Sequence, residues 1–322
     1  MKSNSLLPAS FLAVLALAGC SGGGGASVPT PAPAPSNTSA VALQSVADSW
    51  NAAAPRWRDI SNTLYSSAFQ SSFSYATGRI TLSYDSSPNV PYFVGHISAR
   101  GLKPNFAYQI KLAGKPVGGP QGWGTTRSYV TASTLAPGAT PTTVNVNGTP
   151  VGGDDWTNQA LGYAGRWWDE TSAPSTNLND DYFRANYPQH TVYGYLFLGD
   201  FVTDANGNAE ADVRGNASYH ITWQDGQSGN KDVVFGTFPV NQSSYGYAAP
   251  LGSTTQKLWY ELEAGRAQPV TLPSGTYHAR VLITEEAFHG AGGAGGGVWQ
   301  TVFASETLGD TNPANDVVFS IR

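Results

Sequence analysis

Residues 191–203 read TVYGYLFLGDFVT and carry apolar side chains on both faces of an extended chain: Tyr193, Tyr195, Phe197 and Phe201 on one, Val192, Leu196 and Leu198 on the other. A β-strand that is apolar on both faces belongs in the interior of a packed structure. The following five residues, DANGN at 204–208, predict a tight hairpin turn, because Asn-Gly accepts the positive φ angles of such turns. The sequence therefore predicts a buried strand, a turn and a second strand at 210–213.

The same strand signals recur along most of the chain, at residues 79–84, 92–98, 106–112, 219–223, 233–240, 277–284, 298–304 and 317–321. The composition agrees, because 37 Gly and 21 Pro among 322 residues suit short strands joined by turns and suit helical bundles poorly. Aromatic residues make up 12% of the chain and can fill a sizeable core. We therefore expect an all-β fold.

Two short motifs suggest how the strands are arranged. Residues 101–108 read GLKPNFAY, and residues 272–277 read LPSGTY. The first resembles the Leu-x-Pro-x-x-x-Tyr corner of fibronectin type III and related immunoglobulin-like β-sandwiches, in which the Tyr hydroxyl bonds back to the corner backbone. The resemblance implies a β-sandwich over residues 79–322 and leaves the function open, since such folds serve many roles.

The spacing of the predicted strands departs from a standard seven-strand module. Residues 117–189 and 241–269 are too long for simple loops. We interpret 117–189, which is dense in aromatic residues, as an ordered insertion carried on the sandwich. Whether residues 79–322 form one sandwich or two is left open.

Residues 41–78 form a less regular lead-in. Val41, Leu43, Val46, Ala47 and Trp50 are spaced as on one face of a helix. We expect one short helix in this segment.

The N-terminal forty residues read as an export signal and a tether. Residues 1–19 combine Lys2 with a short apolar run that is too short to span a bilayer, which needs about 20 residues. Residues 20–40 are rich in Gly, Pro and Ala and cannot bury a core, so we expect an extended tether.

The junction between these segments, Leu17-Ala18-Gly19-Cys20, resembles the lipobox of bacterial lipoproteins. The resemblance implies a lipid-acylated Cys20 as the first residue of the mature chain, and Ser21 after it implies sorting to the outer membrane, facing the periplasm or the cell surface. Cys20 is also the only Cys, so the fold has no disulfide to rely on. An ordinary signal peptide with a chance Cys is the alternative.

The charge pattern argues against nucleic acid as a partner. The formal net charge is −5, and the 17 Lys and Arg residues are scattered, with no basic run to neutralise phosphates. The sequence also lacks a polybasic stretch for anionic lipids, so we expect membrane attachment through the lipid anchor alone.

An aromatic and acidic cluster in the insertion is the first candidate binding site. Trp156, Trp167 and Trp168 could stack on sugar rings, and Asp169 could accept hydrogen bonds from sugar hydroxyls. The alternative is that these tryptophans form a small core that holds the insertion to the sheet.

Histidines offer the second candidate. His220, Glu286 and His289 could bind Zn or Cu, but the chain lacks an H-x-H or H-E-x-x-H motif. The alternative is that these are separate, hydrogen-bonded residues on strands.

The sequence thus favours a membrane-anchored extracytoplasmic lipoprotein with a non-catalytic module that binds a glycan or protein or has a structural role in the envelope. We expect no cofactor. A metal-binding module or metalloenzyme is the second hypothesis, and a carbohydrate-binding or carbohydrate-active protein is the third.

Overall fold

The computed structural model describes residues 37–46, 54–114, 144–146, 149–151, 157, 160–161, 164–169, 177–178, 192–215, 220–222, 233–261, 271–286, 301–306 and 313–322. Its strands are β1 (Thr38–Ser45), β2 (Arg79–Asp85), β3 (Val94–Arg100), β4 (Ala107–Ala113), β5 (Val144–Val146), β6 (Thr149–Val151), β7 (Arg166–Asp169), β8 (Asn177–Leu178), β9 (Val192–Val202), β10 (Ala209–Arg214), β11 (His220–Thr222), β12 (Val233–Gln242), β13 (Gly252–Glu261), β14 (Gly275–Glu286), β15 (Thr301–Ala304) and β16 (Val317–Ile321). The helical elements are short: α1 (Ser67–Ser72), η1 (Ala54–Trp57), η2 (Tyr75–Thr77) and η3 (Pro313–Asn315).

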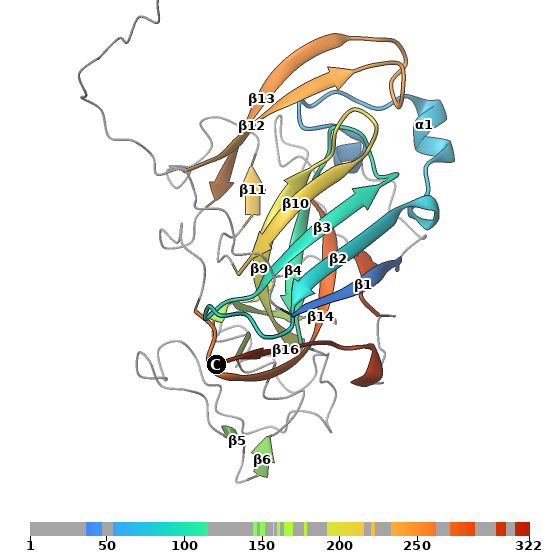
Figure 1. Ribbon diagram of the computed structural model, residues 1–322. Coiled ribbons are helices and arrows are strands. Elements are labelled where there is room, and N and C mark those ends of the chain that lie inside the picture. Colours follow the sequence, from blue (N-terminus) through green and yellow to red (C-terminus); the bar gives the residue numbers. More distant parts are fainter. Residues whose placement is uncertain are drawn as a thin grey trace, which may run out of the picture. The chain divides into compact units, whose positions relative to one another are not determined.

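The described strands are all paired antiparallel and form one large sheet, one three-stranded sheet and one hairpin (Figure 1). The large sheet has eleven strands in the order β10-β3-β2-β1-β15-β14-β4-β9-β7-β8, with β16 paired to the first half of β14. The smaller sheet has the order β11-β13-β12, and β5 pairs with β6. The predicted all-β class is therefore confirmed, and the immunoglobulin-like form of the sandwich remains a prediction.

Strands from both ends of the large sheet contribute side chains to one apolar core. Leu82 of β2 and Ile97 of β3 belong to the same buried cluster as Ile110 of β4, Leu196 of β9 and Ile283 of β14. These side chains alternate along their strands with residues that point away from the cluster, as the two-residue period of a strand requires. Burial on this side therefore fixes the register of each strand.

Both tyrosine corners form as the sequence predicts. The Tyr108 hydroxyl accepts a hydrogen bond of 3.1 Å from the backbone N–H of Lys103. The Tyr277 hydroxyl donates a bond of 2.7 Å to the carbonyl of Pro273. Asn105 turns the first corner at φ 49°, a left-handed conformation that Asn tolerates better than most residues.

The tight turn predicted at 204–208 is present, but the strands that it joins, β9 and β10, pair with β4 and β3 in the described sheet and not with each other. The Asp204 carboxylate accepts hydrogen bonds from the backbone N–H groups of Asn206 and Asn208. Gly207 adopts φ 75°, and a Cβ atom built there would lie 2.0 Å from the carbonyl oxygen of Leu102. The turn therefore packs directly against the corner, and glycine is required both for its backbone angle and for its size.

The helix predicted from the spacing of Val41 to Trp50 is wrong for the part that the structure describes. Residues 38–45 form β1, which pairs with β2 over the first six residues and with β15 over Gln44 and Ser45. Residues 38–40, assigned to the tether, therefore belong to the sheet. A short helix does occur in the lead-in, but later, at α1.

The predicted faces of β9 need one correction. Phe201 packs in the main core with Leu196 and Leu198, whereas Tyr195 and Phe197 lie in a separate cluster with residues of β14 and β15. The cause is a β-bulge, because β9 gains one residue relative to β4 between these two sets. One extra residue exchanges the faces of everything that follows it.

Candidate functional site

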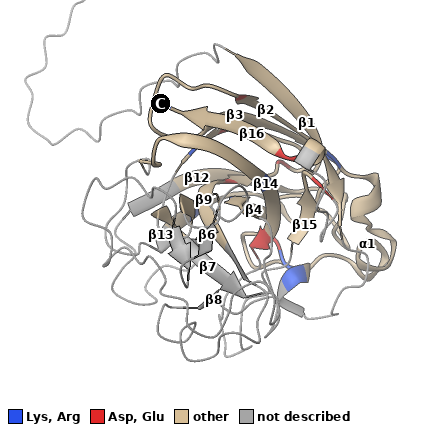
Figure 2. Ribbon diagram, turned by 90° about the horizontal axis from the view of Figure 1, so that it is seen from below, with Lys and Arg blue, Asp and Glu red and all other residues tan. Residues whose placement is uncertain are grey.

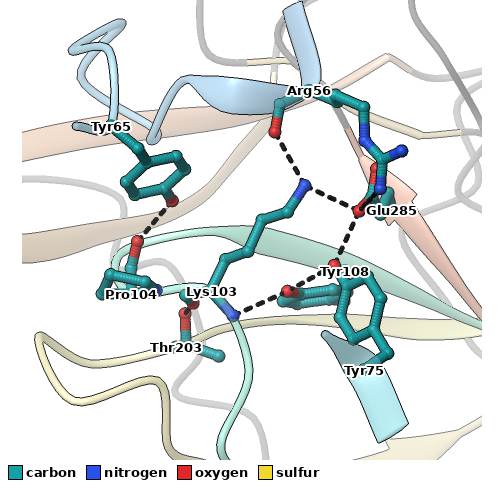
Figure 3. A network of polar contacts seen from close by, with 8 residues as sticks. All are labelled: Arg56, Tyr65, Tyr75, Lys103, Pro104, Tyr108, Thr203 and Glu285. Atoms are coloured by element: carbon teal, nitrogen blue, oxygen red, sulfur yellow. Dashed lines mark hydrogen bonds and ion pairs between the residues drawn. The ribbon is translucent and has the colours of Figure 1, made fainter. Parts of the chain in front are cut away.

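A cluster of charged and phenolic side chains is buried beside the first corner (Figure 3). The Glu285 carboxylate, through Oε1, accepts hydrogen bonds from Arg56 at 2.9 Å, Lys103 at 2.6 Å and the Tyr75 hydroxyl at 2.7 Å. The Tyr75 and Tyr108 hydroxyls lie 3.0 Å apart. We call these five residues the ion cluster. Each is at most 1% exposed, so they interact in a medium that screens charge poorly.

Aromatic rings enclose the cations of the ion cluster. The Lys103 ammonium lies 4.7 Å from the centroid of the Trp57 ring and 4.5 Å from that of Phe106. It also donates a hydrogen bond of 2.7 Å to the carbonyl of Arg56. Ring faces attract cations, and this attraction offsets part of the desolvation of the ammonium.

The pKa values in the ion cluster follow from burial and charge. Burial lowers the pKa of Lys103 to about 8, although Glu285 opposes the shift. Burial alone would raise the pKa of Glu285, but Lys103 and Arg56 together hold it below the ordinary value of 4.5. Burial and the charge of Glu285 raise the pKa of Tyr75 and Tyr108 far above their usual range.

The ion cluster joins three parts of the chain and serves the fold. Arg56 comes from the lead-in, Lys103 from the corner, and Glu285 from the end of β14. Arg56, Lys103 and Tyr75 all donate to the same carboxylate oxygen of Glu285, and each of the five side chains is at most 1% exposed. We therefore interpret the cluster as an internal clamp and not as a reaction centre.

A second set of polar side chains lies on the opposite side of the same strands. The face of β14, β4 and β9 that points away from the main core, here called the outer face, carries Thr284, Gln109 and Asp200. Gln109 is the register partner of Thr284 on one side and of Asp200 on the other. Directly opposed residues of antiparallel strands point to the same face, so the three form one row.

The side chains of this polar row are buried, and several of their polar atoms have no hydrogen-bond partner in the described part of the chain. Asp200 is 8% exposed, Gln109 1% and Thr284 3%. Both Asp200 carboxyl oxygens, the Gln109 amide nitrogen and the Thr284 hydroxyl lack hydrogen-bond partners there. Burial and the nearby charge of Glu286 raise the pKa of Asp200 well above its usual range, against the opposing charge of Lys111.

An exposed charged cluster lies across β3 and β10. His96 places Nδ1 2.9 Å from an Asp212 oxygen and Nε2 3.0 Å from a Glu210 oxygen. Arg100 also pairs with Glu210. The two carboxylates meet different ring nitrogens, so they satisfy an imidazolium that donates at both positions and are not arranged around one shared metal ion.

His96 should titrate above its ordinary pKa of 6.5, since the hydrogen bond to Asp212, aided by Glu210, outweighs partial burial. A raised folded-state pKa stabilises the protein fully below pH 6.5, and this contribution is lost as the pH rises through the higher folded value. We expect this contribution to the free energy of unfolding to be below about 1 kcal/mol, because the ring is 45% exposed. NMR titration of the His96 ring measures its pKa. The pH-dependent part of the stability should be absent from the His96→Gln variant. A pKa at or below 6.5 would contradict it.

The structure describes three of the four residues predicted for glycan binding. Trp167, Trp168 and Asp169 lie in β7, which pairs with residues 192–195 of β9. Trp156 lies outside the described residues. The tryptophan-bearing strand is thus the direct neighbour of the strand that carries Asp200.

Two of the three predicted metal ligands, His220 and Glu286, lie in the described part of the chain. His220 is the first residue of β11, and Glu286, fully buried, is the last of β14. His289 and Cys20 lie outside the described residues. Among the residues that are described, no group of three or more His, Cys, Asp or Glu side chains is placed to hold a metal ion. Zn or Cu binding stays a prediction.

The sequence interpretation missed the polar row and the ion cluster. One signal was present for the row, because Gly199-Asp200 interrupts an otherwise apolar strand, and a glycine inside a strand often marks a bulge. The ion cluster left no comparable signal, since Lys103 and Glu285 are 182 positions apart.

Comparison with known proteins gave no match among protein-family models, curated proteins or solved structures. Within the part of the chain that the structure covers, no helix has the length and apolar character needed to cross a membrane.

Proposed function

We propose that this protein is a lipoprotein of the bacterial outer membrane, attached through an acylated Cys20, whose β-rich module binds a glycan outside the cytoplasm without catalysing a reaction. The observation that carries the placement is the motif Leu17-Ala18-Gly19-Cys20 behind a short apolar run. The Gly- and Pro-rich residues after it supply a tether between lipid and module.

The organisation of the described strands supports a binding module. Its charges are few, and most of the described ribbon is neutral (Figure 2). Three of its buried charged side chains, Arg56, Lys103 and Glu285, form ion pairs with one another. A sheet stabilised by buried ion pairs can serve as a scaffold that presents a binding surface.

The glycan is favoured over a protein ligand by the residues next to β9. Strand β7 brings the Trp167-Trp168 pair alongside β9, and β9 itself carries Tyr195, Phe197 and Asp200. Aromatic and carboxyl side chains are the residue types that recognise sugar rings and hydroxyls.

The anchor is tested by expressing the full chain in a Gram-negative host and analysing its N-terminal peptide by mass spectrometry. We expect Cys20 as the first residue, with acyl chains attached, and recovery of the protein in the outer-membrane fraction. Cys20→Ser should abolish acylation and release the protein from that fraction. An unmodified thiol with Met1 still in place would refute the placement.

Glycan binding is tested with the detergent-solubilised full chain on an array of neutral hexose oligosaccharides. Retention of at least one oligosaccharide class supports the proposal. Absence of binding to every member would overturn the choice of ligand and would leave the anchor standing.

A further inference from the structure

The polar row is unusual because its three side chains are neighbours in register and are all buried. Thr284, Gln109 and Asp200 come from β14, β4 and β9, and strands lie about 4.8 Å apart, so the row extends over roughly 10 Å. Buried polar groups in native proteins are nearly always hydrogen-bonded, and exceptions call for an explanation. Three adjacent exceptions point to a missing partner that they share.

The bulge in β9 supports this view. Leu196 and Leu198 point into the main core, and an uninterrupted strand would send residue 200 to the same side. The extra residue reverses the alternation and sends Asp200 to the outer face, next to Gln109. Bulges that redirect a side chain are common beside functional sites.

The chemistry of the outer face defines the partner. The Gln109 amide donates, the Thr284 hydroxyl donates and accepts, and the Asp200 carboxyl accepts through either oxygen and also donates when it is protonated. A ligand hydroxyl also donates and accepts, so it matches all three. Glu286 on this face would repel an anion, and Lys111 would repel a cation.

Aromatic rings complete the face one register step away. The next pairing along β4 joins Lys111 to Phe197, and the rings of Phe197 and Tyr195 form an edge-to-face pair with centroids 5.6 Å apart. The Lys111 ammonium lies 5.6 Å from the centroid of the Tyr195 ring and 5.4 Å from that of Phe197, so the rings and this cation border the polar row together.

We infer that the outer face of β14, β4 and β9 is an enclosed subsite for a neutral mono- or disaccharide, whose hydroxyls bond to Asp200, Gln109 and Thr284. This inference rests on the proposed glycan-binding function and names its site. Because the groups are enclosed, binding requires a local opening, and slow association is expected.

The test compares sugar affinity with thermal stability in the full chain. Gln109→Leu and Thr284→Val each remove a group that lacks a partner without ligand, so they should leave the melting temperature unchanged or higher while weakening binding of the best array sugar about tenfold or more. Asp200→Asn keeps a donor and an acceptor and should bind like the parent, whereas Asp200→Leu should not. Thr276→Val, at an exposed site on the same strand, is the matched control: it removes one exposed hydroxyl contact with Ser320, so it should leave sugar affinity unchanged and alter the melting temperature little.

The outcomes separate the two proposals. If the parent protein binds no array sugar, the glycan function fails, and this inference fails with it. If the parent binds and the Gln109→Leu and Thr284→Val variants bind equally well, the site lies elsewhere and only the inference is refuted. Loss of melting temperature together with affinity would show a structural role for the row and would also refute the subsite.

Discussion

Glu285→Gln is expected to lower the free energy of unfolding by about 3–5 kcal/mol, the usual cost of removing one partner from a buried ion pair. The substitution keeps the side-chain shape but removes the negative charge of Glu285 from beside Lys103 and Arg56, which are 0% and 1% exposed. Urea unfolding of parent and variant, with equal slopes, measures the difference.

Glu210→Gln provides the matched control for this prediction. It makes the same chemical change in an ion pair with Arg100, but at about half exposure, and should cost below about 1 kcal/mol. Equal effects of the two substitutions would contradict the clamp that we assign to Glu285.

The pH dependence gives an independent check on Glu285. Its pKa is held below 4.5 in the folded state, so its contribution to stability is present above about pH 4.5 and is lost as the pH falls through the folded-state pKa. The parent should therefore lose stability on acidification more steeply than Glu285→Gln. If the stability of the parent and of Glu285→Gln fell equally with decreasing pH, the lowered pKa of Glu285 would be contradicted.

Gly207→Ala is expected to be the second large effect, with a loss of at least about 2–3 kcal/mol. A Cβ atom would meet the backbone carbonyl of Leu102 at 2.0 Å, and backbone cannot swing aside as a flexible side chain can. The positive φ angle at position 207 adds about 1 kcal/mol or more to this loss of stability when the residue is not glycine. Thermal unfolding followed by circular dichroism measures the change.

Gly252→Ala separates the two causes. Gly252 also has positive φ, at 100°, but nothing lies within 4 Å of the Cβ position. It should show the cost of the backbone angle alone. A loss at Gly207 no larger than that at Gly252 would mean that the turn moves away from the corner at little cost.

Local pattern was enough to predict most strands, because alternation records which side chains face the core. The corner tyrosines were predictable for the same reason, since the Tyr108 hydroxyl bonds only five residues back. Strand β1 was mistaken for a helix because its partners, at residues 80–85 and 303–304, are remote in sequence and contribute the pairing that decides its conformation.

Strand β13 was missed because it begins with the polar run Gly252-Ser253-Thr254-Thr255, which is exposed on both faces and shows no alternation. The polar row could not be assigned for another reason. A bulge is set by the register between two strands, and one sequence alone does not show which residue of β9 is the extra one.

The position of β1 has a mechanical consequence. The strand nearest the tether is held by neighbours on both sides and is not at the border of the sheet. Tension applied along β1 would therefore load the backbone bonds between residues 38–43 and β2 in shear, so that these bonds break together and not residue by residue. Single-molecule pulling from residue 37 should show one high rupture force, and stepwise low-force peeling would contradict this view.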